Sequence, residues 1–380
     1  MAELVQTDAV KIEERACTGG MQSGMKLGII TLDAPKSLHA LNLDMIRAID
    51  AALLRWQDDA QIACVVLQSS TDKAFCAGGD VRSLRTAVLE QPAVVPNPQA
   101  LAFFAEEYRL DYRIHTYAKP LLVWGGGIVM GGGLGLMAGA SHRVVTETTR
   151  IAMPEIAIGL FPDVGGSWFL SRMPGRTGLF LGLTGAAMNA ADALFVGLGD
   201  YFLRQDERAA VIDALAQASW QAGEQANHEQ LSRLLQTMAA PASLLPVSEV
   251  RTHYNSIAAL TQAPTLAEVA AAIASYNGDA PWLQKAAHTL VKGAPSSAAL
   301  TWTMRERTRH LSLAQVFQLE LIVAVQCCAH ADFAEGVRAL LIDKDGAPQW
   351  QPATLNGIEA AYLDEFFTAP WQQHPLADLA

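Results

Sequence analysis

The first two hundred residues alternate short apolar runs with segments of helical periodicity. Apolar and β-branched runs predict buried strands at 27–32, 62–67, 120–124 and 142–146. Apolar residues at helical spacing predict helices at 43–56, 81–89 and 103–117, with a turn at 33–36 and a proline-bearing loop at 91–98. Strands that alternate with helices indicate an α/β layer architecture.

After about residue 200 the pattern changes, because strand signals nearly vanish. Helical periodicity predicts helices at 208–220, 228–238, 248–260, 266–276, 298–310 and 313–329. One short strand signal remains, at 337–342. We therefore divide the chain into an α/β part, residues 1–200, and a mainly helical part, residues 201–380.

Composition narrows the class of protein. Hydrophobic residues make up 51% of the chain and charged residues 17%, which favours a large core and disfavours disorder. The formal charge of −11 disfavours nucleic acid as a partner, although a small anionic ligand stays open. The glycine-broken run 121–140 predicts a strand and a short helix rather than a membrane span.

Cysteines and the N-terminal segment predict a reducing compartment. The five cysteines form no CxxC pair, and no His/Cys spacing suggests a metal site. Residues 1–14 carry four acids and no apolar core of a signal peptide. We therefore expect a cytoplasmic protein without a metal.

Two glycine-containing segments, 75–80 (FCAGGD) and 125–133 (GGGIVMGGG), each follow a predicted strand. Glycine lets the backbone approach a ligand or adopt positive φ, so both segments can present N–H groups to a bound molecule. The structural alternative is a tight strand-to-helix junction, with Asp80 as a helix N-cap. A dinucleotide fingerprint beginning at Gly133 is disfavoured, because only about eight residues precede the next strand and a crossover needs about a dozen.

Two acids stand in apolar surroundings. Glu155 follows Met153-Pro154, and Asp163 follows Phe161-Pro162. A carboxyl among apolar residues must be paired, protonated or functional. The structural alternative is that each acid caps a helix. Two acids beside glycine N–H donors favour instead a site that polarises an acyl carbonyl and attacks it, whereas Glu106 and Glu107 have the pattern of surface charges.

With these residues, the chain resembles the crotonase (enoyl-CoA hydratase/isomerase) superfamily, and within it the 3-hydroxyisobutyryl-CoA hydrolase branch. The resemblance is carried by residues 28–46, 73–84, 103–112, 127–136, 152–175 and 333–352. The last of these and the FPDVGG run at 161–166 are typical of the hydrolase branch. The fold that the resemblance implies is an α/β, crotonase-like spiral of ββα units with a helical C-terminal region.

The resemblance also implies roles for single residues. The N–H groups of Gly79 and Gly132 would form an oxyanion hole, Glu155 would be the catalytic glutamate, Asp163 the second carboxyl, and Glu107 a substrate contact. The remaining substrate-binding positions would be Ala77, Gly78 and Gly131. Gly135 stands where hydratases of the superfamily carry a second catalytic glutamate, which disfavours hydration of a C=C bond.

The implied reaction is hydrolysis of a short, branched β-hydroxyacyl-CoA thioester, a step of valine catabolism, with coenzyme A arriving as part of the substrate and no separate cofactor. Glu155 would attack the carbonyl or activate water, and Asp163 would place water, hold the substrate hydroxyl or tune Glu155. Relatives in the superfamily are often trimers, which suggests a homo-oligomer, but a long helical C-terminal part that covers the usual interface differently leaves the number of subunits open. Enoyl-CoA hydration or isomerisation, and acyl-CoA binding without catalysis, remain as alternatives.

Overall fold

A computed structural model describes residues 7–19, 24–221 and 223–380. The first six residues of the N-terminal segment, including Glu3, lie outside the described residues. The chain groups into two compact units that each combine three stretches. We call them the sheet unit (Met1–Gly79, Arg113–Ile151 and Met188–Ser248) and the helical unit (Asp80–Tyr112, Ala152–Ala187 and Glu249–Ala380). The division predicted at residue 200 stays a prediction.

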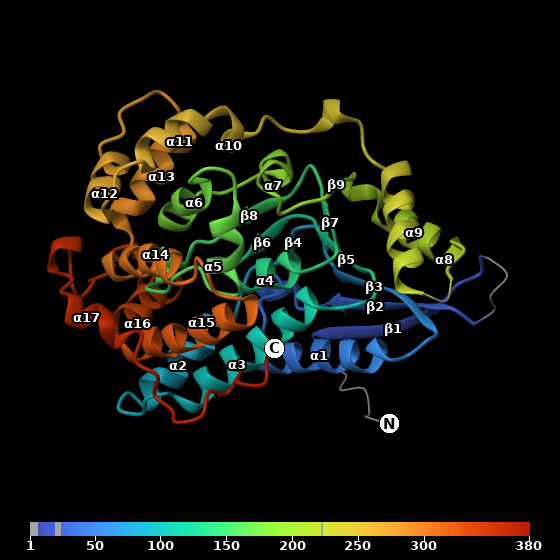
Figure 1. Cartoon of the computed structure of the whole chain (residues 1–380), viewed down its shortest axis with the longest axis horizontal. Coiled ribbons are helices and arrows are strands. Elements are labelled where there is room, and N and C mark those ends of the chain that lie inside the picture. Colours follow the sequence, from blue (N-terminus) through green and yellow to red (C-terminus); the bar gives the residue numbers. More distant parts are fainter. Residues whose placement is uncertain (1–6, 20–23, 222) are drawn as a thin grey trace. The chain divides into compact units, whose positions relative to one another are not determined.

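The sheet unit contains a six-stranded sheet in the order β1-β2-β3-β5-β7-β9 (Figure 1). Its first two strands are antiparallel and the other neighbours are parallel. The strands are β1 (Val10–Ala16), β2 (Lys26–Leu32), β3 (Ile62–Ser69), β5 (Leu121–Gly125), β7 (His142–Val145) and β9 (Tyr201–Phe202). The four strands predicted at 27–32, 62–67, 120–124 and 142–146 are confirmed.

A second, three-stranded sheet has the order β4-β6-β8. These strands, which were not predicted, have three residues each: β4 (Ala74–Cys76), β6 (Ile128–Met130) and β8 (Arg150–Ala152). Strands of this length are too short to show an alternating pattern. Because β4 and β6 pair in parallel, their carboxyl ends point the same way, and a glycine segment follows each.

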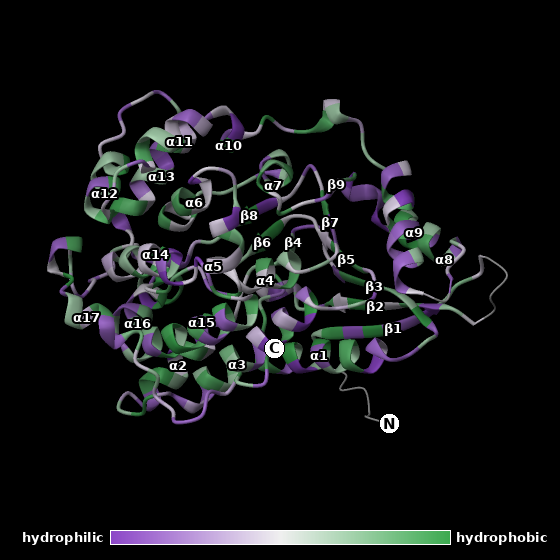
Figure 2. Cartoon of the chain, in the orientation of Figure 1, coloured by the Kyte–Doolittle hydropathy of each residue, from purple (hydrophilic) through white to green (hydrophobic). Residues whose placement is uncertain are grey.

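Helices cover both faces of the six-stranded sheet. On one face, α1 (Leu43–Gln57) packs against β2, where a Cβ on Gly28 would lie 2.6 Å from the Trp56 ring. Figure 2 shows the alternating polar and apolar bands along α1. On the other face lie α8 (Arg208–Gln217) and α9 (Glu224–Thr237). The two faces follow from the alternation of Leu27 and Gly28 along one strand.

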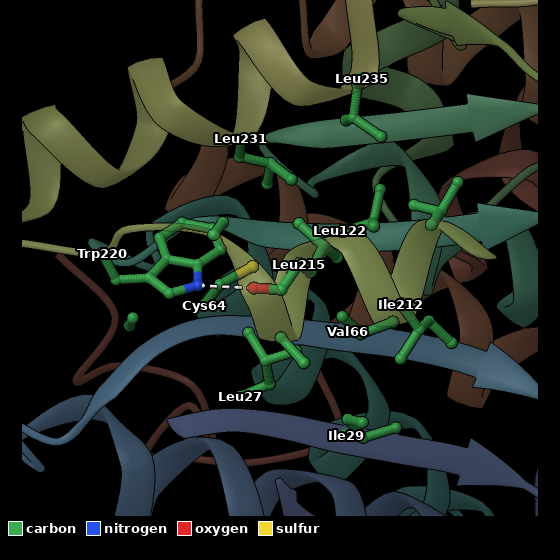
Figure 3. Packing of buried hydrophobic residues seen from close by; sticks show 14 of the residues in the cluster. Leu27, Ile29, Cys64, Val66, Leu122, Ile212, Leu215, Trp220, Leu231 and Leu235 are labelled. Atoms are coloured by element: carbon green, nitrogen blue, oxygen red, sulfur yellow. Dashed lines mark hydrogen bonds between the residues drawn. The ribbon is translucent and has the colours of Figure 1, made fainter. Parts of the chain in front are cut away.

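The core between the sheet and these last two helices is apolar (Figure 3). Leu27, Cys64 and Leu122 from three strands meet Leu215 and Trp220, all buried. The Trp220 Nε1–H donates to the Leu215 carbonyl oxygen at 2.8 Å, so the one polar atom of the indole is satisfied inside the core.

The helical unit takes its elements from both halves of the sequence. It holds α2 (Val81–Glu90), most of α3 (Pro98–His115), η2 (Glu155–Ile158), α5 (Gly166–Phe169), α6 (Thr177–Thr184), α10 (Glu249–Thr252), α11 (Tyr254–Thr261), α12 (Leu266–Ala274), α13 (Pro281–Lys292), α14 (Pro295–Arg307), α15 (Leu313–Ala329), α16 (Ala331–Val337) and α17 (Ala360–Glu365). The sheet unit adds α4 (Gly132–Ala138) and α7 (Ala190–Val196).

The strand predicted at 337–342 is wrong. There α16 continues into η6 (Arg338–Ile342), one turn of π-helix. The Arg338 guanidinium donates to the Glu335 carboxylate at 2.8 Å, a contact that the three-residue spacing of a helix permits. The helix predicted at 248–260 is broken into α10 and α11, and α13 was not predicted.

Among the described residues, no single helix has the length and apolar character needed to cross a membrane. The two consecutive helical segments Leu313–Ala329 and Ala331–Ile342 have this length and apolar character only when taken together, and they are bent by 75° relative to each other. In the run 121–140 the predicted strand and short helix are confirmed as β5 and α4, with β6 between them.

Candidate active site

Two glycine turns lie against each other in the sheet unit. Residues 77–79 follow β4, and Gly131 and Gly132 follow the parallel strand β6. Gly78 and Gly131 have φ values of +107° and +48°, which side chains disfavour. A Cβ on Gly133 would lie 2.4 Å from the Cys76 carbonyl oxygen, so the second turn approaches the first as closely as only glycine permits.

These turns leave two amides without acceptors. Gly132 is the first residue of α4, where an N–H has no partner inside the helix. The first turn is fixed by its other groups, because the Leu41 N–H donates to the Gly78 oxygen at 2.8 Å and the Ala77 N–H to the Leu38 oxygen at 3.1 Å. Within the described part of the chain, neither the Gly79 nor the Gly132 N–H has a protein acceptor. Two such donors can bind a developing oxyanion.

Asp80, next to this turn, has the structural role that the sequence favoured. It is the N-cap of α2, and its carboxylate accepts from the Ser83 N–H at 3.2 Å and from the Ser83 hydroxyl at 2.6 Å. Gly135, where a second glutamate would stand in a hydratase, is buried in α4.

The helical unit buries a group of five acids, which we call the acid cluster. Each of the five residues is at most 4% exposed, and no Lys or Arg of the described residues pairs with any of them. They come from α3, from η2, from the loop that follows it and from α15: Glu107, Asp111, Glu155, Asp163 and Glu320. Neutral hydrogen-bond donors serve Asp163 and Glu320, whereas in the described part of the chain both carboxylate oxygens of Asp111 and Oε2 of Glu155 have no hydrogen-bond partner.

Asp163 is held by a tyrosine. The Tyr108 hydroxyl donates to Asp163 Oδ2 at 2.6 Å, and the Gly166 N–H donates to the Asp163 backbone oxygen at 2.6 Å. The turn that follows has positive φ at Val164 (+52°) and Gly165 (+83°). The Glu320 carboxyl stabilises this turn, because its two oxygens accept from the N–H groups of Gly165 and Ser167 at 2.7 and 2.9 Å.

Glu155 opens η2 and is 4% exposed, so it does not face bulk solvent. Its Oε2 atom has no hydrogen-bond partner. Neither predicted cap forms, since η2 and α5 both lack a side-chain cap and the N-cap of α5 is Gly165. The structural alternatives for Glu155 and Asp163 are therefore wrong.

Burial sets the proton affinity of the cluster. It raises the pKa of Glu155 well above the ordinary value, and the Asp163 charge raises it further. The same two causes raise the pKa of Glu107. Burial raises the pKa of Asp163 only to about 6, because the Tyr108 hydroxyl favours the charged form. A protonated and an ionised carboxyl in one apolar setting can together donate and accept protons.

The structure corrects one prediction about α3. Glu107 is buried, so its interpretation as a surface charge is wrong, whereas Glu106 is partly exposed. The predicted acids Glu107, Glu155 and Asp163 come together in the acid cluster, and the predicted glycines come together in the sheet unit. Their roles stay predictions.

Three members of the arrangement were missed: Tyr108, Asp111 and Glu320. Two of them left a signal in the sequence. Asp111 lies four residues after Glu107 and so on the same helix face, and Glu320 is the only charged residue of the apolar helix α15. Nothing near Tyr108 in the sequence points to Asp163, which lies 55 residues away.

The sequence is similar over most of its length to one protein family and to named proteins. A family model described as enoyl-CoA hydratase/isomerase matches residues 27–367. The chain is 37% identical over 361 residues to the mitochondrial 3-hydroxyisobutyryl-CoA hydrolase of Danio rerio, covering 90% of this chain and 87% of that protein. For the Homo sapiens protein of the same name, the identity is 33% over 366 residues, covering 95% and 89%.

The fold is also similar to solved structures of proteins that act on CoA thioesters by their names. An enoyl-CoA hydratase from Rhodobacter sphaeroides 2.4.1 is similar with a TM-score of 0.79 at 33% identity. A carnitinyl-CoA dehydratase from Mycobacterium thermoresistibile is similar with a TM-score of 0.82 at 30% identity. Each comparison covers 96% of this chain and 98% of the other. The predicted crotonase-like α/β fold is confirmed.

Proposed function

Since the chain belongs to the enoyl-CoA hydratase/isomerase family, we propose that it hydrolyses a short, branched β-hydroxyacyl-CoA thioester of the 3-hydroxyisobutyryl-CoA type. The products are the free acid and coenzyme A. The observation that carries the proposal is the likeness, over at least 90% of this chain, to proteins named 3-hydroxyisobutyryl-CoA hydrolase. The buried carboxyl of Asp163 supports it, because the resemblance assigns this position to the hydrolases.

In this proposal, the Gly79 and Gly132 amides bind the thioester oxygen as it gains charge. Loss of one such donor costs about 2.7–4 kcal/mol of the barrier. Glu155 either attacks the carbonyl carbon to form an anhydride and expel the CoA thiolate, or takes a proton from the water that attacks. Both routes require Glu155 to be ionised at the moment of reaction, and its raised pKa makes the carboxylate a strong base.

The direct test is thiol release from 3-hydroxyisobutyryl-CoA by the purified protein. Glu155→Gln is expected to lower turnover by about 100-fold or more with the fold intact. Glu106→Gln is the matched control, because the Glu106 side chain is partly exposed and has no role in the proposal. Unchanged turnover in Glu155→Gln would remove this residue from the mechanism.

Enoyl-CoA hydration is the second candidate. It is favoured by the likeness to a solved enoyl-CoA hydratase at 33% identity. Gly135 in α4 argues against it, because the second catalytic glutamate of hydratases would stand there. A small panel of acyl-CoA and enoyl-CoA substrates separates the two reactions: hydrolysis releases free thiol, whereas hydration removes the enoyl absorbance and releases none. Tight binding of CoA with neither change would indicate an acyl-CoA binder.

The proposal includes no metal and no redox cofactor, so hydrolysis should survive dialysis against a chelator. It also places the enzyme in valine catabolism and in the cytoplasm. The relatives from Danio rerio and Homo sapiens are named mitochondrial. Cell fractionation decides between the compartments, and light scattering tests the proposed homo-oligomer.

A further inference from the structure

Tyr108 makes one of the most buried side-chain contacts of the helical unit. The residue is 0% exposed and Asp163 is 4% exposed, and the tyrosine hydroxyl donates to Asp163 Oδ2 at 2.6 Å. A phenol that is fully removed from water needs a hydrogen-bond partner, so this contact fixes both groups.

The ring of Tyr108 has little freedom to move. Phe104 on the same helix and Phe317 on α15 flank it, each with a ring-centre distance of 5.8 Å. Since aromatic neighbours on two helices hold the ring, the hydroxyl points to one place. The chain therefore brings a rigid donor to a carboxyl 55 residues further along.

The groups around Asp163 make this donor unusual. The titratable groups that interact with it come from α3, from η2 and from α15, and none of those in the described chain is a base: Glu107, Tyr108, Asp111, Glu155, Glu320, Cys327 and Cys328. The charge of Asp163 raises the pKa of Glu107 and Glu155, and burial disfavours that charge. The Tyr108 hydroxyl is the side-chain group that offsets this effect.

We infer that Tyr108 is a positioning residue for Asp163 in the reaction proposed above. By donating to Oδ2, it holds the carboxylate in one orientation and in its charged form, and leaves Oδ1 to accept a proton from water, from the substrate hydroxyl or from Glu155. Tyr108 acts through Asp163 and forms no bond with the substrate. The effect of Tyr108 on turnover rests on the proposed function. The effect of the Tyr108 hydroxyl on Asp163 does not depend on it.

Removal of the hydroxyl has a defined consequence. In Tyr108→Phe the carboxylate of Asp163 loses a charge-assisted hydrogen bond, whose usual strength corresponds to a shift of about one to two pH units. The acidic limb of the pH profile of kcat should therefore move to higher pH by that amount. Turnover near pH 7 should fall about 2- to 10-fold and recover at higher pH.

The matched control is Tyr117→Phe. The Tyr117 hydroxyl is also buried and donates to the Leu53 carbonyl oxygen at 2.8 Å, but this contact lies in the sheet unit, outside the acid cluster. It should cost stability without moving the pH profile. A Tyr108→Phe profile that coincides with that of the wild type would overturn the inference.

Two further measurements keep the inference testable. Replacement of Tyr108 by 3-fluorotyrosine preserves the packing and strengthens the donor, so the acidic limb should move to lower pH. Urea unfolding between about pH 4 and pH 9 reads the Tyr108–Asp163 link without any substrate, because ionisation of Asp163 appears in the stability. If the wild type releases no thiol, the proposed function fails, and the unfolding titration still decides the link. Equal pH dependence of unfolding in wild type and Tyr108→Phe would refute it.

Discussion

Replacement of Asp163 by asparagine should make the protein more stable, and more so as the pH rises. Burial raises the pKa of Asp163 from 3.8 to about 6, so between these values the folded state binds more protons than the unfolded state. The free energy of unfolding therefore decreases as the pH rises through this window. At 1.36 kcal/mol per unit, a shift of about two units costs about 3 kcal/mol above pH 6.

Asparagine avoids this cost because it cannot ionise, and its side-chain oxygen can still accept from the Tyr108 hydroxyl. The stability gain of Asp163→Asn over the wild type should grow from near zero at about pH 4 to about 3 kcal/mol at about pH 8. The stability gain of Asp163→Asn at high pH should exceed this value, since the Asp163 charge also raises the pKa of Glu155 and Glu107. Urea unfolding at the two pH values measures it.

Asp33→Asn is a control of opposite sign. The ion pair with Lys11 lowers the pKa of Asp33, so this acid stabilises the fold as the pH rises and its replacement should cost stability at high pH. A constant difference between Asp163→Asn and wild type across the pH range would refute the raised pKa of Asp163. Under the proposed function, Asp163→Asn is more stable but inactive. This is the trade-off expected when a buried carboxylate costs stability and is needed for catalysis.

Three other substitutions test the contacts of the glycine turns, of the apolar core in the sheet unit and of the turn after Asp163. Gly133→Ala puts a Cβ 2.4 Å from the Cys76 carbonyl oxygen and should lower the free energy of unfolding by about 1–3 kcal/mol, measured in urea. Leu215→Ala opens a cavity in the core against the sheet and should cost about 2–5 kcal/mol in the same assay. Glu320→Ala leaves the Gly165 and Ser167 amides buried without acceptors and should cost at least about 2 kcal/mol. It should also reduce thiol release, because the turn after Asp163 loses its support.

The sequence predicts elements where the pattern is long enough to be read. The apolar runs of β2, β3, β5 and β7 span four to eight residues and were located within one residue or two. The helix at 313–329 was predicted with the bounds that α15 has. The three-residue strands of the second sheet carry no period, and the apolar run at 337–342 fits a strand or a helix equally well until the Glu335–Arg338 pair is seen.

In the candidate site, too, some residues can be predicted from the local sequence and others cannot. Glu155 and Asp163 stand out because their own neighbours in the sequence are apolar, so their burial is visible locally. Glu107 has the charged neighbours Glu106 and Arg109, and its burial follows from contacts that fold onto α3 from elsewhere. Glu320 meets Gly165 across 155 residues of chain, which no periodicity can indicate.

The choice of partners in the acid cluster explains why a buried set of carboxyls can do chemistry. A Lys or Arg beside them would hold each carboxylate ionised at all physiological pH values and make it a weak base. Here the partners are a phenol on Asp163 and two amides on Glu320, while Oε2 of Glu155 has none. The pKa of Asp163 is thereby raised only to about 6 and that of Glu320 to about 8. Asp163 is then the first of these two carboxyls to ionise, and its charge, added to burial, keeps Glu320 protonated to higher pH within the same apolar interior.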